Sequence, residues 1–519
     1  MTNLINDVRS AVAANGERTA LSYDGTDISY EGFFEQVRRF SGALKERGFE
    51  PGDRVGLYLP NLPQYVVGFF GTLHAGGVVV PLNPQYKARE IEHLLSDSET
   101  TVVVTLSDLV GYVDAVVEET SVEHVFSVGD ADGADALNAV LANAPIAEEH
   151  IERHDDDVAV QPYTSGTTGT PKGVLLTHKN LGWDARAAAK LIPDGIDEDD
   201  RFLGVLPLFH IYGMTITMIA TLFEGATYYP VPEWDADTVC SIIEREQITV
   251  MHGVPAMFND MIGLENSDAY DLSTLRFVNS GGSGLPIEVL EGFEATFEVE
   301  LYEGYGLTET SPVTHANSPS NRRPGSIGQP LEGVSARIVD SSFEEVDPVE
   351  KGPVGDDQEL DGLTGELIVS GPNVMKGYAG LPEANEEVFT EADGKRWFHT
   401  GDIGYYDEDG FFYVVDREKH MINTAGYNVY PRELEELLFE HEAVADVAVV
   451  GIDDERRGET VAAFVVPAGE VTEDELKSFC LDRLAEYKHP RTIEFVEELP
   501  RTTTGKVQKF ELKEQSSNE

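Results

Sequence analysis

Cysteine is almost absent from this chain of 519 residues, and its two cysteines, Cys240 and Cys480, lie far apart. A disulfide framework or a zinc cluster needs several cysteines at short spacings, so neither is expected. The most apolar stretch, residues 65–82, is interrupted by a histidine and glycines, whereas a membrane span needs ~20 continuous apolar residues. The first residues also lack the basic start and apolar core of a signal peptide. We therefore expect no membrane span and a reducing, cytoplasmic location.

Basic residues are scarce as well. The chain has 37 lysines and arginines against 94 aspartates and glutamates, which gives a formal net charge of −57. Such a surface repels nucleic acid and anionic lipid, so neither is an expected partner. Because the acidic residues are spread along the whole chain, their repulsion should destabilise the fold in dilute buffer. Molar salt shrinks the Debye length to ~3 Å and removes that repulsion. The composition therefore predicts a halophilic protein.

Helical and strand patterns alternate over the first 300 residues. Residues 30–48 carry apolar side chains at helical spacing and end at a glycine, and residues 55–59 and 102–104 have the pattern of short buried strands. Later strands are expected over 248–252 and 276–280. Strands that alternate with helices form a largely parallel sheet covered on both faces. The predicted fold class is therefore α/β.

The pattern changes twice in the second half of the chain. After residue 330, short strands separated by turns predict an antiparallel β region. From Asp416 onward the sequence has the pattern of a compact α+β unit, and a chain of this length is expected to form several domains. Its helices are expected over 431–439 and 473–486, and its strands over 444–450 and 461–466. We therefore predict two domains, residues 1–415 and 416–519.

Residues 163–173 (YTSGTTGTPKG) gather hydroxyls, glycines and one lysine between two predicted strands, 158–160 and 174–177. Glycines let the backbone approach a ligand and direct several N–H groups at one anion. The hydroxyls and Lys172 are suited to grip phosphate. The order of residues differs from a Walker A loop. A flexible linker is the alternative, but linkers seldom place Pro-Lys-Gly between two strands. We predict a loop that holds a triphosphate.

A second motif, residues 304–309 (GYGLTE), places an aromatic ring, a hydroxyl and a carboxylate close together. An adenine can stack on Tyr305, Thr308 can donate to a phosphate, and Glu309 can hold Mg²⁺, which prefers oxygen ligands near substrate phosphates. Turns that contain Tyr-Gly are common, so this motif alone indicates little.

Other polar residues have two interpretations each. His210, inside PLFHIYG, is either a buried core histidine or a site residue. The Asp402 carboxylate suits ribose hydroxyls. Arg417 and Lys419 flank the predicted boundary and are either site residues or solvated linker charges. Residues 500–506 (PRTTTGK) form a polar loop that ends in a lysine, or else a frayed tail.

Taken together and in this order, the motifs resemble those of the AMP-forming acyl-CoA synthetases, members of the adenylate-forming superfamily. The resemblance rests on residues 163–173, 207–213, 305–309, 365–378, 398–402, 416–435 and 500–506 and covers essentially the whole chain. It implies a large N-terminal domain of two α/β subdomains plus a β region, and a small mobile α+β C-terminal domain. It also implies two half-reactions. A carboxylate attacks the α-phosphate of Mg·ATP to give acyl-AMP and pyrophosphate, and CoA then takes the acyl group while AMP leaves.

The same resemblance implies roles for individual residues. Lys506 would enter the site for adenylation and leave for thioester formation, and Thr308 would meet the α-phosphate. Glu309 would hold Mg²⁺, and His210 would gate the acyl pocket. The implied ATP and CoA contacts are Thr164, Ser165, Gly166, Thr167, Thr168 and Lys172 for the β- and γ-phosphates, Gly281, Gly282, Ser283 and Tyr305 for adenine, Asp402 and Arg417 for ribose, Asn428 near the phosphate, Lys419 at the hinge, and Gly426 beside the CoA channel.

The acid is the least determined substrate. The uncharged residues 311–314 and the lack of a tryptophan in the pocket motifs favour a medium- or long-chain fatty acid over acetate. An aryl acid of the coumarate or benzoate type is the alternative, and an adenylate-only enzyme shares most of the same residues. A nonribosomal adenylation domain would carry an aspartate near Phe209, where this chain is apolar. From another class, a nucleotide-binding protein without turnover also fits. A homo-oligomer is compatible with the sequence.

Overall fold

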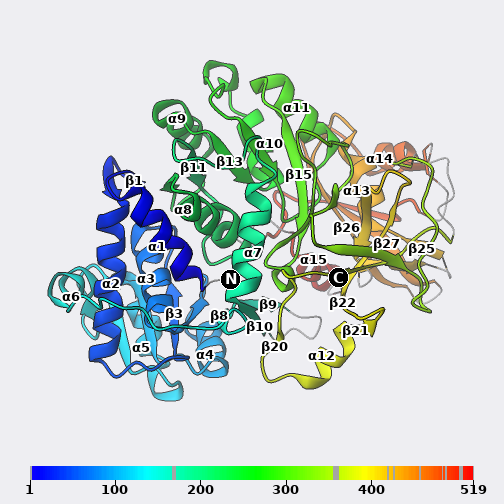
Figure 1. Ribbon diagram of the computed structural model, residues 1–519. Coiled ribbons are helices and arrows are strands. Elements are labelled where there is room, and N and C mark those ends of the chain that lie inside the picture. The colour runs from blue at the N-terminus through cyan, green and yellow to red at the C-terminus, as the bar shows by residue number, and fades with distance from the viewer. Residues whose placement is uncertain are drawn as a thin grey trace.

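The computed structural model describes residues 3–165, 171–354, 362–417, 420–424, 427–454, 457–481, 483–484, 488–501 and 507–517. The architecture is the mixed α/β fold expected from the sequence (Figure 1). Cys240 and Cys480 are both buried and free. Within the described ranges, no helix is long and apolar enough to cross a membrane.

One sheet is formed mostly by the first 180 residues, in the order β20-β10-β8-β4-β3-β5-β6-β7, with β9 paired to β10. Its strands are β3 (Arg54–Tyr58), β4 (Val78–Pro81), β5 (Val102–Leu106), β6 (His124–Val128), β7 (Asp135–Ala136), β8 (Val158–Val160), β9 (Tyr163–Ser165), β10 (Pro171–Thr177) and β20 (Gly377–Tyr378). Alternate residues of β3 and β5 pack on opposite faces, which is the two-sided burial typical of parallel strands. The covering helices are α2 (Tyr30–Glu46), α3 (Pro63–His74), α4 (Ala88–Asp97), α5 (Val110–Asp114) and α6 (Leu137–Asn143).

A second sheet has the order β17-β16-β15-β14-β13-β11-β12-β1-β2. Its strands are β1 (Thr19–Tyr23), β2 (Thr26–Ser29), β11 (Arg201–Gly204), β12 (Thr227–Pro230), β13 (Val250–Gly253), β14 (Phe277–Ser280), β15 (Leu301–Gly306), β16 (Val313–Ala316) and β17 (Gln329–Pro330). Strands β11 to β15 run parallel, so their carboxyl ends meet at one edge. The helices of this part are α1 (Leu4–Asn15), α7 (His178–Ala189), α8 (Ala220–Glu224), α9 (Ala236–Glu246), α10 (Pro255–Ile262) and α11 (Ile287–Phe297).

The β region expected after residue 330 is present and antiparallel. It contains β18 (Ser335–Val339), β19 (Gly365–Ser370), β21 (Phe389–Ala392), β22 (Lys395–Tyr406) and β23 (Phe412–Arg417), with α12 (Pro382–Val388) beside it. Strand β22 pairs with β19, β21 and β23 and is therefore central to this region.

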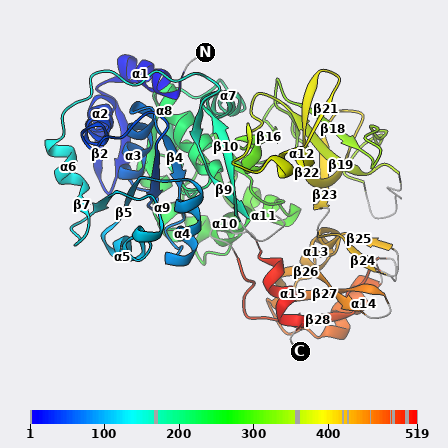
Figure 2. The same cartoon turned by 90° about the horizontal axis from the view of Figure 1, so that it is seen from below.

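The last part of the chain forms its own sheet and core. Its elements are β24 (Ile422–Thr424), β25 (Tyr427–Val429), α13 (Pro431–Phe439), β26 (Val444–Asp454), β27 (Gly458–Pro467), α14 (Glu473–Leu481), β28 (Thr492–Phe495) and α15 (Lys509–Ser517). Figure 2 shows them gathered in a lobe beside the larger body. The chain passes from one sheet to the other between β23 and β24. The division into residues 1–415 and 416–519 as independent domains stays a prediction.

Some element ends differ from those expected. The helix expected over 473–486 ends at Leu481, and after it the Arg483 and Leu484 N–H groups both donate to the Cys480 carbonyl. Strands β26 and β27 exceed the apolar runs that predicted them, since they pair down to Asp454 and Gly458 at the hairpin end. A run of apolar residues predicts the buried middle of such a hairpin, but it does not predict the polar residues that pair at its end.

Candidate functional site

The hairpin of β9 and β10 presents two of the expected phosphate-binding residues. Thr164 and Lys172 are register partners across this hairpin. Strand β20 pairs with the other side of β10 and brings Tyr378 beside it. The Lys172 Nζ atom lies 5.1 Å from the centre of the Tyr378 ring. A cation over an aromatic face is attracted electrostatically, so this contact helps to orient the lysine.

Glu309 joins this group from the second sheet. It lies in a short 3₁₀ turn, Thr308–Thr310, that follows β15, and its side chain is buried. Its Oε1 atom accepts a hydrogen bond from the Tyr378 hydroxyl at 2.9 Å and one from Thr164 Oγ1 at 3.4 Å. Burial, and then the Glu309 charge, raise the pKa of Tyr378, so its hydroxyl remains a donor. The cluster of Thr164, Lys172, Glu309 and Tyr378 therefore unites both sheets.

A second cluster forms around Asp402, which is only 2% exposed. Asp402 on β22 is the register partner of Arg417 on β23, and Arg417 Nε donates to Asp402 Oδ1 at 3.0 Å. The Tyr305 hydroxyl on β15 donates to Asp402 Oδ2. The Asp402 charge raises the pKa of Arg417, whereas burial is the main cause that raises the pKa of Tyr305. Three residues that the sequence named separately thus form one hydrogen-bonded group.

The residues that follow β14, Gly281, Gly282 and Ser283, have a small side chain or none. Gly282 has φ +82°, a conformation that side chains rarely adopt, and Ser283 is exposed. A Cβ at Gly281 would lie 3.0 Å from the Tyr212 ring. Because β14 ends here, these residues lie at the edge where open α/β sheets bind ligands.

His210 is half-buried between β11 and a π-helical stretch, Gly213–Ile219. Its Nδ1 atom accepts from the Tyr212 N–H at 3.2 Å. The Tyr212 hydroxyl accepts from Asn279 Nδ2 at 2.8 Å and lies 3.3 Å from His252 Nδ1. Burial lowers the pKa of His252 to about 3, so this histidine is neutral. The result is a small buried polar group beside Gly281.

Several expected site residues lie outside the described residues, namely Gly166, Thr167, Thr168, Lys419, Gly426 and Lys506. Ser165 and Asn428 lie on β9 and β25, where the backbone alone is described. Thr308 is half-buried directly before Glu309.

Sequence reasoning did not name Tyr378, His252 or Asn279 as site residues. Tyr378 ends the motif at 365–378, so the motif itself carried a signal. The other two lie at or next to the carboxyl ends of β13 and β14, a position that becomes visible only when the strand order is known.

Magnesium is compatible with the first cluster. Among the described residues, no group of three or more His, Cys, Asp or Glu side chains could hold a metal ion without help. Mg²⁺ is usually bound by one or two carboxylates together with substrate phosphates. A single buried carboxylate, Glu309, beside the Thr164 hydroxyl and Lys172 fits that pattern.

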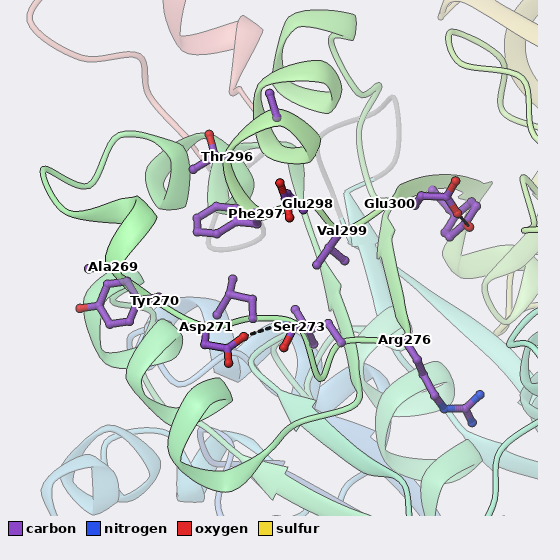
Figure 3. A pocket seen from close by; sticks show the side chains of 14 residues that line it. Ala269, Tyr270, Asp271, Ser273, Arg276, Thr296, Phe297, Glu298, Val299 and Glu300 are labelled. Carbon is purple, nitrogen blue, oxygen red and sulfur yellow. Dashed lines mark hydrogen bonds between the residues drawn. The ribbon is translucent and has the colours of Figure 1, made fainter.

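A cavity of about 660 Å³ lies at the opposite, amino ends of β14 and β15 (Figure 3). Two of its polar groups have internal partners: Arg276 binds Asp200, and Asp271 accepts from the Ser273 N–H. None of the predicted site residues lines this cavity. We assign it no role.

The chain matches two family models and several known proteins. The family model described as AMP-binding enzyme matches residues 8–379, and the one described as AMP-binding enzyme C-terminal domain matches residues 433–506. The chain is 35% identical over 535 residues to a long-chain-fatty-acid–CoA ligase of Bacillus subtilis (strain 168), covering 96% of this chain and 92% of the relative. It is 36% identical over 499 residues to a feruloyl-CoA synthase of an Amycolatopsis species, covering 95% of each.

Among solved structures, MatB from Rhodopseudomonas palustris is similar in two forms. Its ATP-bound form has a TM-score of 0.90 at 30% identity and covers 100% of this chain and 99% of MatB. Its apo form has a TM-score of 0.77 over the same shares of both chains, also at 30% identity.

Proposed function

Because this chain belongs to the AMP-binding enzyme family and is an AMP-forming acyl-CoA synthetase, we propose that it activates a medium- or long-chain fatty acid. ATP and the acid would give acyl-AMP and pyrophosphate, and CoA would then take the acyl group with release of AMP. The observation that carries this proposal is the junction of the two clusters, because Tyr305 and Glu309 belong to one continuous strand and turn.

Each cluster would bind a different part of the nucleotide. Asp402, with Arg417 beside it, would accept the ribose hydroxyls, and the Tyr305 ring, oriented by its bond to Asp402, would stack on adenine. The segment 281–283 would border the adenine. Lys172 and the loop after Thr164 would hold the β- and γ-phosphates, and Thr308 would meet the α-phosphate. Mg²⁺ held by Glu309 would neutralise phosphate charge. Positioning and charge stabilisation supply most of the catalysis of transfer at phosphorus.

The small C-terminal segment would supply the remaining catalytic group. Lys506 would place its ammonium group at the α-phosphate during adenylation, where one preorganised donor contributes roughly 10²–10³ in rate. A hinge at Lys419 would let residues 416–519 move afterward, so that Gly426 borders the CoA channel and Asn428 lies near the phosphate. One cleft would then serve both half-reactions.

Two observations concern the acid. The residues 311–314 are buried and uncharged, which suits an aliphatic chain, and the Bacillus relative acts on long-chain fatty acids. The alternative acid is aromatic, since the Amycolatopsis relative is a feruloyl-CoA synthase. The buried group of Tyr212, Asn279 and His252 beside Gly281 supports this alternative, because it offers hydrogen bonds to a phenol or methoxy group. His210 would gate either acid.

One panel of acids separates these possibilities. Pyrophosphate release, AMP release and CoA consumption are measured with acids from acetate to stearate, with ferulate and with benzoate, each with and without Mg²⁺. We expect the highest kcat/KM with a medium- or long-chain acid. A maximum with ferulate would replace the fatty acid but keep the ligase. Pyrophosphate release without CoA consumption would indicate an adenylate-only enzyme. A lack of pyrophosphate release with every acid of the panel would refute the proposal. The cytoplasmic location stays a prediction.

A further inference from the structure

Helix α13 packs on two sides. Leu434, Leu437 and Leu438 enter the core of the C-terminal lobe. Arg432, Glu436 and Phe439 follow one another at helical spacings of four and three, so they share another face. Phe439 packs against the core of the lobe and also against the core around α10 and α11 of the larger body. This second face of α13 therefore joins the two parts of the protein.

Arg432 occupies a notch in the larger body. A Cβ at Gly284 would lie 2.6 Å from the Arg432 Cζ atom and 2.7 Å from Nη2. Real Cβ atoms do not approach neighbours so closely, so the guanidinium fits here because residue 284 has no side chain. The Arg432 side chain is 23% exposed.

A buried carboxylate lies next to the notch, because it binds the backbone of the residue after Gly284. Glu303 on β15 is 4% exposed, and one of its oxygens accepts from the Leu285 N–H at 3.1 Å. Burial raises the pKa of Glu303 to about 7, and the Arg432 charge opposes that rise. Glu303 lies two residues before Tyr305, on the strand that also leads to Glu309.

Arg432 is also bound to β23. Its backbone N–H donates to Asp416 Oδ2 at 3.0 Å, and its Nη1 atom donates to the Val414 carbonyl at 3.1 Å. Both acceptors lie on the strand that holds Arg417 against Asp402. Arg432 therefore connects to the nucleotide cluster along two elements, β15 and β23.

The whole chain overlaps better with the ATP-bound form of a relative than with its apo form. The ATP-bound and apo structures of MatB both align over the whole chain, yet their TM-scores differ, 0.90 against 0.77. The notch at Gly284 is filled in the arrangement that overlaps better with the ATP-bound structure.

We propose that Arg432, seated at Gly284 and facing Glu303, is a positioning residue that holds α13 on β15 and thereby keeps Arg417 and Asp402 on Tyr305 during adenylation. This inference rests on the proposed function and adds a determinant of its first half-reaction. Arg432 acts through Arg417 and Asp402. Removal of its charge should slow acyl-AMP formation and leave the transfer of a supplied acyl-AMP to CoA unchanged.

The protonation of Glu303 supplies a readout that a purely structural role would not change. The charged groups that face it are Arg432 and Glu436 of α13. The Asp416 charge on β23 raises the pKa of Arg432, and Glu288 on α11 interacts electrostatically with Glu436. An ionised Glu303 attracts Arg432, whereas a protonated one does not. Adenylation should therefore weaken as the pH falls through about 7, and Glu303→Gln should remove that step.

The experiment measures both half-reactions in the full-length protein. Wild type must first form acyl-AMP from ATP and an acid of the panel; failure at this stage contradicts the proposed function and not the role of Arg432. We then expect Arg432→Met to lower kcat of adenylation ~10- to 100-fold, as small misplacements do, with little change in KM for the acid. Arg432→Lys should restore part of the rate.

Two glycine variants test the notch independently. Gly284→Ala should displace the guanidinium and reproduce the effect of Arg432→Met. Gly111→Ala on α5 is the matched control, because a Cβ there meets nothing within 4 Å, and it should retain wild-type rates. Normal adenylation in both Arg432→Met and Gly284→Ala, or equal loss of both half-reactions, would overturn the inference. An unchanged pH step in Glu303→Gln would also overturn it.

Discussion

The hydroxyl of Tyr378 is the most direct test of the Glu309 cluster. Tyr378→Phe removes the 2.9 Å hydrogen bond to Glu309 Oε1 and leaves the ring beneath Lys172 in place. Glu309 then retains only the longer contact with Thr164 at 3.4 Å among the hydrogen bonds described for its carboxylate. A hydrogen bond to a charged group contributes about 1.5–3 kcal/mol. Since each 1.36 kcal/mol corresponds to a factor of ten, a carboxylate held less firmly should bind its ligand ~10- to 100-fold more weakly.

The assay is the dependence of acyl-AMP formation on Mg²⁺ concentration at saturating ATP and acid. We expect the half-saturating Mg²⁺ concentration to rise by that factor in Tyr378→Phe. Tyr30→Phe is the control, because the buried Tyr30 hydroxyl donates to the Ala226 carbonyl at 2.7 Å and to no residue of either cluster. It should lose about 1 kcal/mol of stability and keep its Mg²⁺ dependence. An identical Mg²⁺ dependence in wild type and Tyr378→Phe would refute the role given to Glu309.

Three further outcomes are expected. Lys506→Ala should abolish adenylation and spare thioester formation from supplied acyl-AMP, and equal loss of both steps would contradict its assignment. The unfolding midpoint should rise from dilute buffer to molar KCl, because salt screens the net charge of −57, and a midpoint highest in dilute buffer would rule out halophilic adaptation. Burial lowers the pKa of His315 to about 3. The unfolded histidine has the higher pKa, ~6.5, so protonation favours the unfolded chain as the pH falls from ~6.5 to about 3. In His315→Gln the free energy of unfolding should fall less steeply over this range, by up to about 1.4 kcal/mol per pH unit.

Local chemistry allowed much of the site to be predicted. Hydroxyls, glycines and Lys172 in 163–173 indicated phosphate binding because each residue type has a fixed chemical capacity. The order of seven motifs along the chain indicated the family, which the family models and curated relatives then confirmed. Alternating helices and strands indicated the parallel sheets, because burial on both faces imposes continuous apolar strands.

Contacts between distant segments could not be predicted in this way. Tyr378 reaches Glu309 only because β20 pairs with β10 and thus brings residues 377–378 to the first sheet. Asp402 meets Tyr305 because β22 carries it against β15, although 97 positions separate them in the sequence. The pairing of strands is a long-range choice, and no local pattern records it.

The sequence by itself determined the residue types available for catalysis, the family and the positions of several apolar strands, because these depend on composition and on spacing along the chain. Only the tertiary structure decided which carboxylate holds which hydroxyl, and that Arg432 enters the notch at Gly284. The physical reason is that side-chain chemistry is local, whereas distance and burial depend on how remote elements pack together.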